Sequence, residues 1–329
     1  MSSSSSAAPS ATAASRPGRM LTVAAAQSGP VSRDSSRSEV VARRIDQLRE
    51  AHRLGAELVV FPECALTAFF PHWMVDSEEE LDSWFETEMP GPVTRPLFEE
   101  ARRLGVGFHL GYAERVPGED GTSRRYNSAI LVGQSGEVIG RFRKIHLPGY
   151  HEPRPAEPFQ NLEKRYFDVG DLGFRAWPAF GGTVGMCICN DRRWPETWRV
   201  LGLQGTELVL VGYNTPMQIP GQPQMDHLVS FHNQLCLQAG AWQNGMWTVA
   251  VAIAGIEEGV PQLGQSAIIA PSGEIACMAT TTGDELLVHR IDLDATRPWK
   301  EFMFNFAANR KVEHYRLITE RTAAGPPLE

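Results

Sequence analysis

The chain has 329 residues, of which 42% are hydrophobic and 21% are charged, a composition typical of a globular protein with a sizeable core. The formal net charge is −8, and the Lys and Arg residues form no block of the kind that binds nucleic acids or anionic membranes. The longest apolar run, residues 247–254, is far shorter than the roughly 20 residues that span a bilayer. We therefore expect neither nucleic acid nor a membrane among the partners.

The first 19 residues are rich in Ser and Ala and lack the hydrophobic region of a signal peptide, so we predict a disordered tail. This acid-free stretch weakly resembles a transit peptide, and Met20 is an alternative native start. The irregular spacing of five cysteines, at positions 64, 187, 189, 236 and 277, favours a reduced cytoplasmic protein with free thiols over a disulfide framework.

Short apolar runs alternate with segments of helical periodicity along the chain, which is typical of α/β architecture. Strands are predicted over residues 21–27, 57–62, 106–112, 127–133, 137–143, 183–188, 207–212, 247–254, 265–270, 274–278 and 286–291. Helices are predicted over residues 37–54, 94–104, 195–204 and 226–244. The first helix has a capping box of Ser36 and Glu39 and ends at Gly55.

No linker or shift in composition divides residues 20–315, so we predict one domain, preceded by the tail and followed by a second tail over residues 316–329. Its two halves have a similar order of strands and helices. This order suggests two sheets packed together with helices outside, although a single doubly wound sheet fits the periodicity equally well.

Three chemically reactive residues stand at the ends of strand-like runs. Glu63 ends the run 57–63, Lys144 ends 138–144, and Cys189 ends 183–189. Strand ends are where a rigid sheet presents side chains to a cleft. A carboxylate, an ammonium and a thiol that converge there could deprotonate a nucleophile, stabilise an oxyanion and attack a carbonyl carbon. Taken singly, each has a plainer interpretation: a solvated strand end, part of a basic edge strand, and a small buried side chain.

These three runs, with Arg-Lys-Ile-His-Leu-Pro-Gly at 143–149, resemble the nitrilase superfamily of carbon–nitrogen hydrolases, which uses a Glu-Lys-Cys triad. Further blocks resemble the N-carbamoyl-D-amino-acid amidohydrolases within it, at residues 69–71, 86–92, 159–160, 162–167, 170–174 and 213–216. The resemblance implies a four-layer α-β-β-α sandwich and a homodimer or homotetramer. It also implies hydrolysis of the ureido C–N bond of N-carbamoyl-D-amino acids to the D-amino acid, ammonia and carbon dioxide, through a covalent cysteine thioester.

The resemblance also implies roles for residues around the triad. Glu152 matches a second glutamate that orients the lysine or relays protons, with a surface carboxylate as the alternative. Because guanidinium groups bind carboxylates bidentately, Arg192 and Arg193 are candidates to hold the substrate's carboxylate, or they form a surface pair near Glu196. The polar residues that match the pocket are Asn214, Thr215 and His146, the last with a structural hydrogen-bonding role favoured. Position 150 is Tyr where these enzymes usually have His, so the resemblance does not define the fine shape of the pocket, although it still covers the triad.

We expect no metal and no cofactor. His227 and His232 are five residues apart on a predicted helix and so point to different faces. Cys187 lies two residues before Cys189 and is expected to be a deeper, packing residue. The alternatives to the function above are another amidase of the superfamily, such as an aliphatic amidase or a 3-ureidopropionate hydrolase, and a non-catalytic scaffold.

Overall fold

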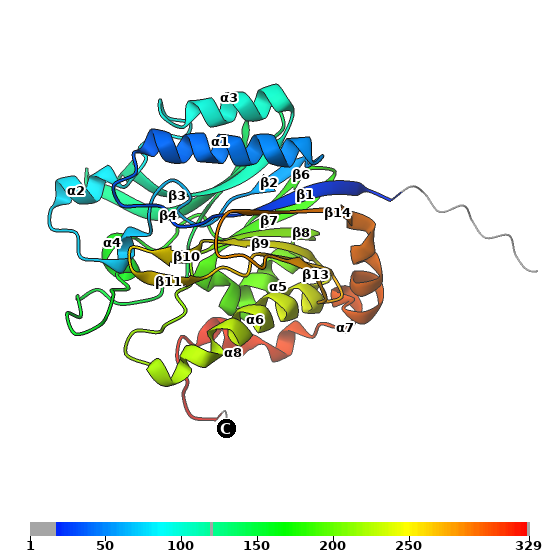
Figure 1. Cartoon of the computed structure of the whole chain (residues 1–329). Helices are drawn as coiled ribbons and strands as arrows, with labels where there is room; N and C mark the ends of the chain where they lie inside the picture. The colour runs from blue at the N-terminus through cyan, green and yellow to red at the C-terminus, as the bar shows by residue number, and fades with distance from the viewer. Residues whose placement is uncertain (1–17, 119–120, 328–329) are drawn as a thin grey trace, which may run out of the picture.

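The computed structural model describes residues 18–118 and 121–327 (Figure 1). The predicted disordered tail lies outside the described residues except for its last two positions. Of these, Arg19 is held in the fold, since its Nε donates to Asp294 Oδ1 at 3.0 Å. In the predicted second tail, a short helix, α8 (Arg316–Glu320), is formed.

Two six-stranded sheets form the centre of the molecule. The first has the order β14 (Glu285–Asp292), β1 (Met20–Gln27), β2 (Leu58–Val60), β3 (Gly107–Pro117), β4 (Ser123–Val132) and β5 (Val138–Arg143). The second has the order β13 (Ile275–Met278), β12 (Ala267–Ile269), β9 (Trp247–Ala252), β8 (Leu208–Tyr213), β7 (Gly182–Ile188) and β6 (Ala176–Ala179). The three central strands of each sheet that follow one another, β1-β2-β3 and β7-β8-β9, are parallel.

Alternating side chains of β1 show why two sheets pack together. Val23 and Ala25 belong to the core shared with the second sheet, whereas Ala24 and Ala26 belong to the core beneath α1. Each sheet thus buries one face against the other sheet and one against helices. The helices α1 (Arg37–Arg53) and α3 (Arg95–Leu104) cover the first sheet, and α5 (Pro195–Leu203) and α6 (Val229–Asn244) cover the second (Figure 1). The four-layer α-β-β-α sandwich is confirmed.

Every predicted strand and helix is present, with ends that shift by one to a few residues. The capping box is confirmed, because Glu39 N donates to Ser36 Oγ and Ser36 N donates to the Glu39 carboxylate. Strand β6 was not predicted because Pro178 interrupts its short run. The separate two-stranded sheet of β10 (Ala254–Glu257) and β11 (Val260–Leu263) was also missed, since its first strand continues the apolar run of β9.

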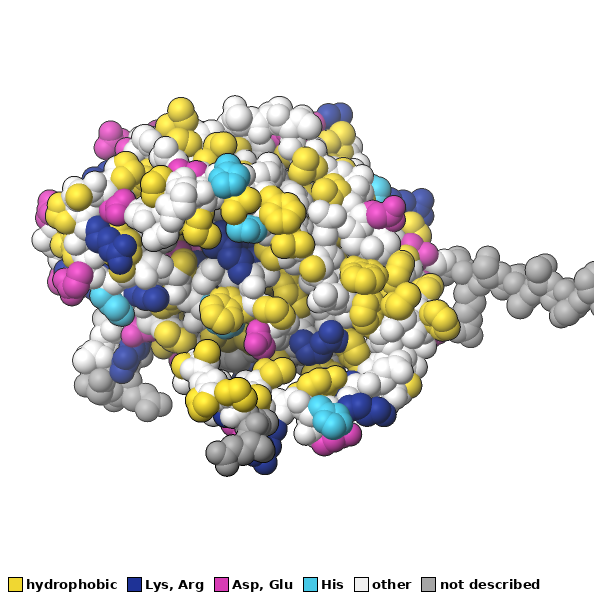
Figure 2. Space-filling view, turned by 90° about the horizontal axis from the view of Figure 1, so that it is seen from below, with side chains coloured by type: hydrophobic (Ala, Val, Ile, Leu, Met, Phe, Trp, Pro, Cys, Tyr) yellow, Lys and Arg dark blue, Asp and Glu magenta, His cyan; other side chains and the backbone are white. Residues whose placement is uncertain are grey.

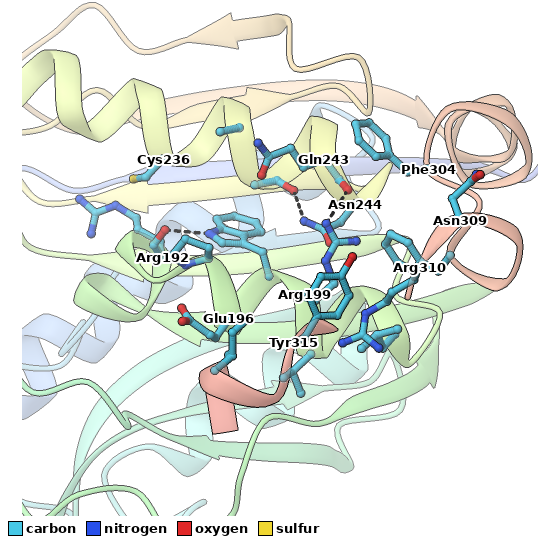
Figure 3. A pocket seen from close by; sticks show the side chains of 18 of the residues that line it. Arg192, Glu196, Arg199, Cys236, Gln243, Asn244, Phe304, Asn309, Arg310 and Tyr315 are labelled. Carbon is cyan, nitrogen blue, oxygen red and sulfur yellow. Dashed lines mark hydrogen bonds between the residues drawn. The ribbon is translucent and has the colours of Figure 1, made fainter. Parts of the chain in front are cut away.

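The C-terminal segment, residues 299–320, crosses the outer side of α5 and α6 and has no buried residue. It includes α7 (Phe306–Asn309) and α8, and it leaves a groove of about 720 Å³ against the two helices (Figure 3). Figure 2 views this side of the molecule and shows apolar side chains gathered over it. In the described parts of the chain, no helix is long and apolar enough to cross a membrane.

Candidate active site

Glu63 and Lys144 meet between the two sheets. Glu63 follows β2 by three residues, and Lys144 directly follows β5. The Lys144 Nζ donates to Glu63 Oε1 at 2.7 Å, and neither side chain has any exposed surface. The sequence-based expectation that these two strand ends converge therefore agrees with the observed geometry.

Two glycines, one from each sheet, make room for the backbone of Glu63. A Cβ atom on Gly111 of β3 would lie 2.7 Å from Glu63 Cα, and one on Gly212 of β8 would lie 2.6 Å from Glu63 N. Any larger residue would push the chain aside. The carboxylate is then fixed by Asn214 N, which donates to Oε2 at 2.8 Å, and by Asn127 Nδ2, which donates to Oε1 at 2.7 Å.

The second carboxylate on Lys144 is that of Glu163, not Glu152. Lys144 Nζ donates to Glu163 Oε2 at 2.5 Å, and Glu163, the first residue of α4 (Glu163–Tyr166), is 2% exposed. Glu152 is exposed in the preceding loop. The apolar neighbours of Glu163, Leu162 and Tyr166, are buried in an aromatic core, and this pattern is the sequence signal that could have identified it.

Cys189 stands at the end of β7 with an unusual backbone. Its φ is 45°, in the left-handed region that non-glycine residues adopt at a cost of roughly 1–3 kcal/mol. The side chain is 3% exposed, and its Sγ donates to Asn214 O at 3.4 Å. Asn214 thus binds the Cys189 thiol through its carbonyl oxygen and the Glu63 carboxylate through its N–H group. This arrangement brings the third predicted residue to the same place.

His146 and Asp191 connect the loop after Lys144 to the turn after Cys189. The buried Asp191 Oδ1 accepts from His146 N at 2.9 Å and lies 2.8 Å from His146 Nδ1, while its Oδ2 accepts from Ile188 N at 3.2 Å. The imidazole stacks on Trp194 with 4.7 Å between ring centroids. These contacts agree with the favoured structural role of His146.

The two arginines after Cys189 have different surroundings. Arg192 is fully buried, stacks over the ring of Tyr213, and donates to Cys189 O at 2.7 Å and to Thr215 Oγ1 at 3.0 Å. Its Nε and Nη2 also donate to Asn233 Oδ1, at 3.1 Å and 2.8 Å. Arg193 is exposed and donates to Asn190 Oδ1 at 3.3 Å. The site thus contains one arginine bound within the protein and one open to solvent.

The other four cysteines are also free thiols. Cys187 has no exposed surface, in agreement with the deeper position expected for it. In residues 18–118 and 121–327, no group of three or more His, Cys, Asp or Glu side chains could hold a metal ion.

A model of the carbon-nitrogen hydrolase family matches residues 22–301. The chain belongs to this family. It is 32% identical to a nitrilase of Pyrococcus abyssi over 278 residues, which cover 84% of this chain and 92% of the relative. It is 30% identical to an N-carbamoylputrescine amidase of Oryza sativa subsp. japonica over 316 residues, covering 92% and 95% of the two chains.

Among solved structures, a carbon-nitrogen hydrolase from Helicobacter pylori G27 has the same fold, with a TM-score of 0.78 and 21% sequence identity over 92% of this chain and 99% of the other. The matches support hydrolysis of carbon–nitrogen bonds in amides as the reaction class. They do not single out N-carbamoyl-D-amino acids as the substrate.

Burial and charge set the protonation of this hydrolase's site. Burial raises the pKa of the Cys189 thiol, and Glu63 raises it further, against the lowering effect of Lys144 and Arg192. Burial likewise raises the pKa of Glu163 to about 7. Burial lowers the pKa of Lys144, but Cys189, Glu163 and Glu63 outweigh it and hold the value well above the usual range. These directions favour a neutral thiol and a charged ammonium in the resting site.

We predict that Glu163 makes stability pH-dependent. Its raised pKa contributes stability that is fully present below about pH 4.5 and is lost as the pH rises through about 7. From pH 5 to pH 8, the free energy of unfolding of the wild type should therefore fall by on the order of 2 kcal/mol relative to Glu163→Gln. Urea unfolding at both pH values measures this difference. The exposed Glu152→Gln is the matched control, and parallel curves for wild type and Glu163→Gln would contradict the prediction.

Proposed function

We propose that the protein hydrolyses the ureido C–N bond of N-carbamoyl-α-amino acids, with Cys189 as nucleophile, Glu63 as general base and Lys144 as oxyanion donor. The observation that carries this proposal is the buried Lys144–Glu63 contact of 2.7 Å, which Asn214 links to the strained Cys189. A thiol with a raised pKa needs a base nearby, and the shared contact of Cys189 and Glu63 with the backbone of Asn214 supports Glu63 in that role.

The reaction would run in two halves. The Cys189 thiol gives its proton to Glu63 and its sulfur attacks the ureido carbonyl carbon, whose oxygen becomes negative beside the Lys144 ammonium. The intermediate collapses, and the leaving nitrogen takes the proton from Glu63 and departs as an amine. A water molecule that Glu63 deprotonates then attacks the thioester carbonyl carbon, and the sulfur leaves and takes that proton back from Glu63, which restores the thiol and the carboxylate. The carbamate formed breaks down, so that the products are the amino acid, ammonia and carbon dioxide.

Arg193 supports a substrate with a carboxylate. It lies in the turn that follows Cys189, is exposed, and has no carboxylate within ion-pair distance among the described residues. Arg192 cannot serve as readily, because its donors already bind within the protein. A substrate built on putrescine ends in an amine, which Arg193 would repel. The preference for the D configuration rests on the sequence resemblance alone.

Replacing the nucleophile is the first test of this mechanism. We expect Cys189→Ala to abolish turnover of an N-carbamoyl-D-amino acid while its circular dichroism and melting temperature stay close to wild type. Cys187→Ala, two residues away on the same strand, is the matched control and should retain most activity. An active Cys189→Ala protein, or an inactive but folded Cys187→Ala protein, would contradict the assignment.

Arg193→Ala tests the substrate class. A charged hydrogen-bonded contact contributes roughly 1.5–3 kcal/mol, so kcat/KM on an N-carbamoyl amino acid should fall on the order of tenfold to a hundredfold. The loss on the corresponding amide, which lacks the negative charge, should be slight. Arg193→Lys should restore activity only in part, because an ammonium cannot reproduce the planar fork. Equal losses on both substrates would show that Arg193 does not bind the substrate's carboxylate. A wild type that prefers the neutral amide would favour an aliphatic amidase, and one that prefers the β-amino analogue would favour a 3-ureidopropionate hydrolase.

The face of α5, α6 and the C-terminal segment supports the further proposal of a homodimer. Phe302 and Ile318 of the C-terminal segment are 82% and 59% exposed. Apolar side chains gather on this side of the molecule (Figure 2), and large exposed apolar surfaces are uncommon on monomers. In the groove, Arg199 and Arg310 have no carboxylate within ion-pair distance among the described residues, and they lie close to Tyr315 (Figure 3). The exposed Glu313 of the same segment could pair with them across a two-fold axis, where each copy offers both charges.

Sedimentation velocity tests this assembly. The wild type is expected to be a dimer or a larger oligomer, and Phe302→Glu combined with Ile318→Glu should yield monomers, because each buried carboxylate would lose its hydration. Leu54→Glu, which introduces the same charge at an exposed site beside α1 on the opposite side, should leave the oligomer unchanged. A monomeric wild type would rule the proposal out.

A further inference from the structure

Glu257 is a buried carboxyl group that does not belong to the triad. It is the last residue of β10 and is 1% exposed. Its Oε2 accepts from Phe69 N at 2.9 Å and its Oε1 accepts from Val31 N at 3.1 Å. No Lys, Arg or His nitrogen among the described residues lies within ion-pair distance. Since an unpaired buried carboxylate is costly, these two N–H groups are its compensation.

The segment that begins at Phe69 leads to Glu163 through backbone hydrogen bonds. Gln160 N donates to His72 O at 2.8 Å, and Leu162 N donates to Pro71 O at 2.9 Å. Leu162 directly precedes Glu163, whose carboxylate holds Lys144. Residues 69–72 therefore hold residues 160–162, which lead directly to Glu163, through backbone hydrogen bonds. Glu257 in turn holds the first residue of that segment, Phe69.

The other half of the same loop is held by cations on α1. Arg44, which has no exposed surface, donates through Nε to Ala65 O at 2.9 Å, and Arg37 donates through Nη1 to Leu66 O at 2.8 Å. The segment between Glu63 and Phe69 is thus bound by arginine donors at Ala65 and Leu66 and by the Glu257 carboxyl oxygens at Phe69. One end of the segment carries Glu63, and the other leads into residues 69–72, which bind the residues before Glu163. Both carboxylates bind Lys144.

We infer that Glu257 is a positioning residue for the reaction: through the segment 69–72 it sets where Glu163 holds Lys144, and so where the ammonium stands relative to Cys189. This inference rests on the proposed roles of Lys144 and Cys189. It does not require that the substrate be an N-carbamoyl amino acid.

Glu257→Gln tests the inference, because the amide keeps the shape but can accept only one of the two N–H groups properly. A displacement of about 1 Å in a catalytic group costs on the order of a hundredfold in rate, so we expect kcat to fall tenfold to a hundredfold with KM changed less than about threefold. The neighbouring Glu258→Gln is the matched control, because Glu258 is exposed and its carboxylate accepts from Arg33 N at 2.8 Å. It should leave both parameters within about twofold of wild type.

A second measurement needs no substrate. The rate at which iodoacetamide alkylates Cys189, followed by mass spectrometry of its peptide, should rise at higher pH in Glu257→Gln than in wild type, because Lys144 no longer lowers the pKa of the thiol as strongly. If the proposed substrate is wrong, wild type fails to turn it over while this shift persists. A folded Glu257→Gln protein with a lower melting temperature but unchanged kcat and alkylation profile overturns the inference.

Should Glu257→Gln fail to fold, Glu257→Asp decides the matter. It keeps the charge but withdraws the carboxylate by one methylene, so it cannot reach both N–H groups. We expect the same direction of change in kcat and in the alkylation profile. Wild-type values for both in the folded aspartate variant would overturn the inference.

Discussion

The contact on which the site depends is that of one ammonium with two carboxylates in a space closed to water. Lys144 Nζ donates to Glu63 and to Glu163, and all three side chains are at most 2% exposed. Removing one partner from a buried ion pair typically destabilises by roughly 3–5 kcal/mol, because it leaves an uncompensated charge. The two sheets must therefore bring β2, β5 and α4 to one point, and much of the loop structure serves that requirement.

The close approach of the sheets follows from the small residues at their contact. Gly111 and Gly212 contribute no side chain where the backbone of Glu63 passes between them. A bulkier residue at either position would separate β3 or β8 from Glu63 and lengthen the contact with Lys144. Gly111 and Gly212 have no reactive side chain, yet they allow the close packing that excludes water and sets the distance between Glu63 and Lys144.

The sequence predicted the three convergent residues because strand ends are visible as the ends of apolar runs. It failed at Glu163, because the choice between Glu152 and Glu163 depends on how a loop of some twenty residues folds back, which no local pattern encodes. The sequence also could not show which of Arg192 and Arg193 is buried and which is exposed. Adjacent residues in a tight turn point in different directions, and only the structure reveals that one is enclosed by Tyr213 and Asn233. Periodicity likewise left two packed sheets and one wound sheet equally acceptable, since both need the same alternation.

The enclosure of Arg192 gives that residue a role other than recognition of substrate. Its guanidinium donates to the carbonyl oxygen of Cys189, whose backbone is left-handed, and to Thr215, which follows the residue that binds Glu63. A strained conformation persists only when its surroundings over-determine it. Arg192 supplies such a constraint from inside the turn, while Asp191 supplies another through Ile188 N. Cys189 is thus held from both sides by charged groups, and Arg193 is the exposed arginine of the same turn.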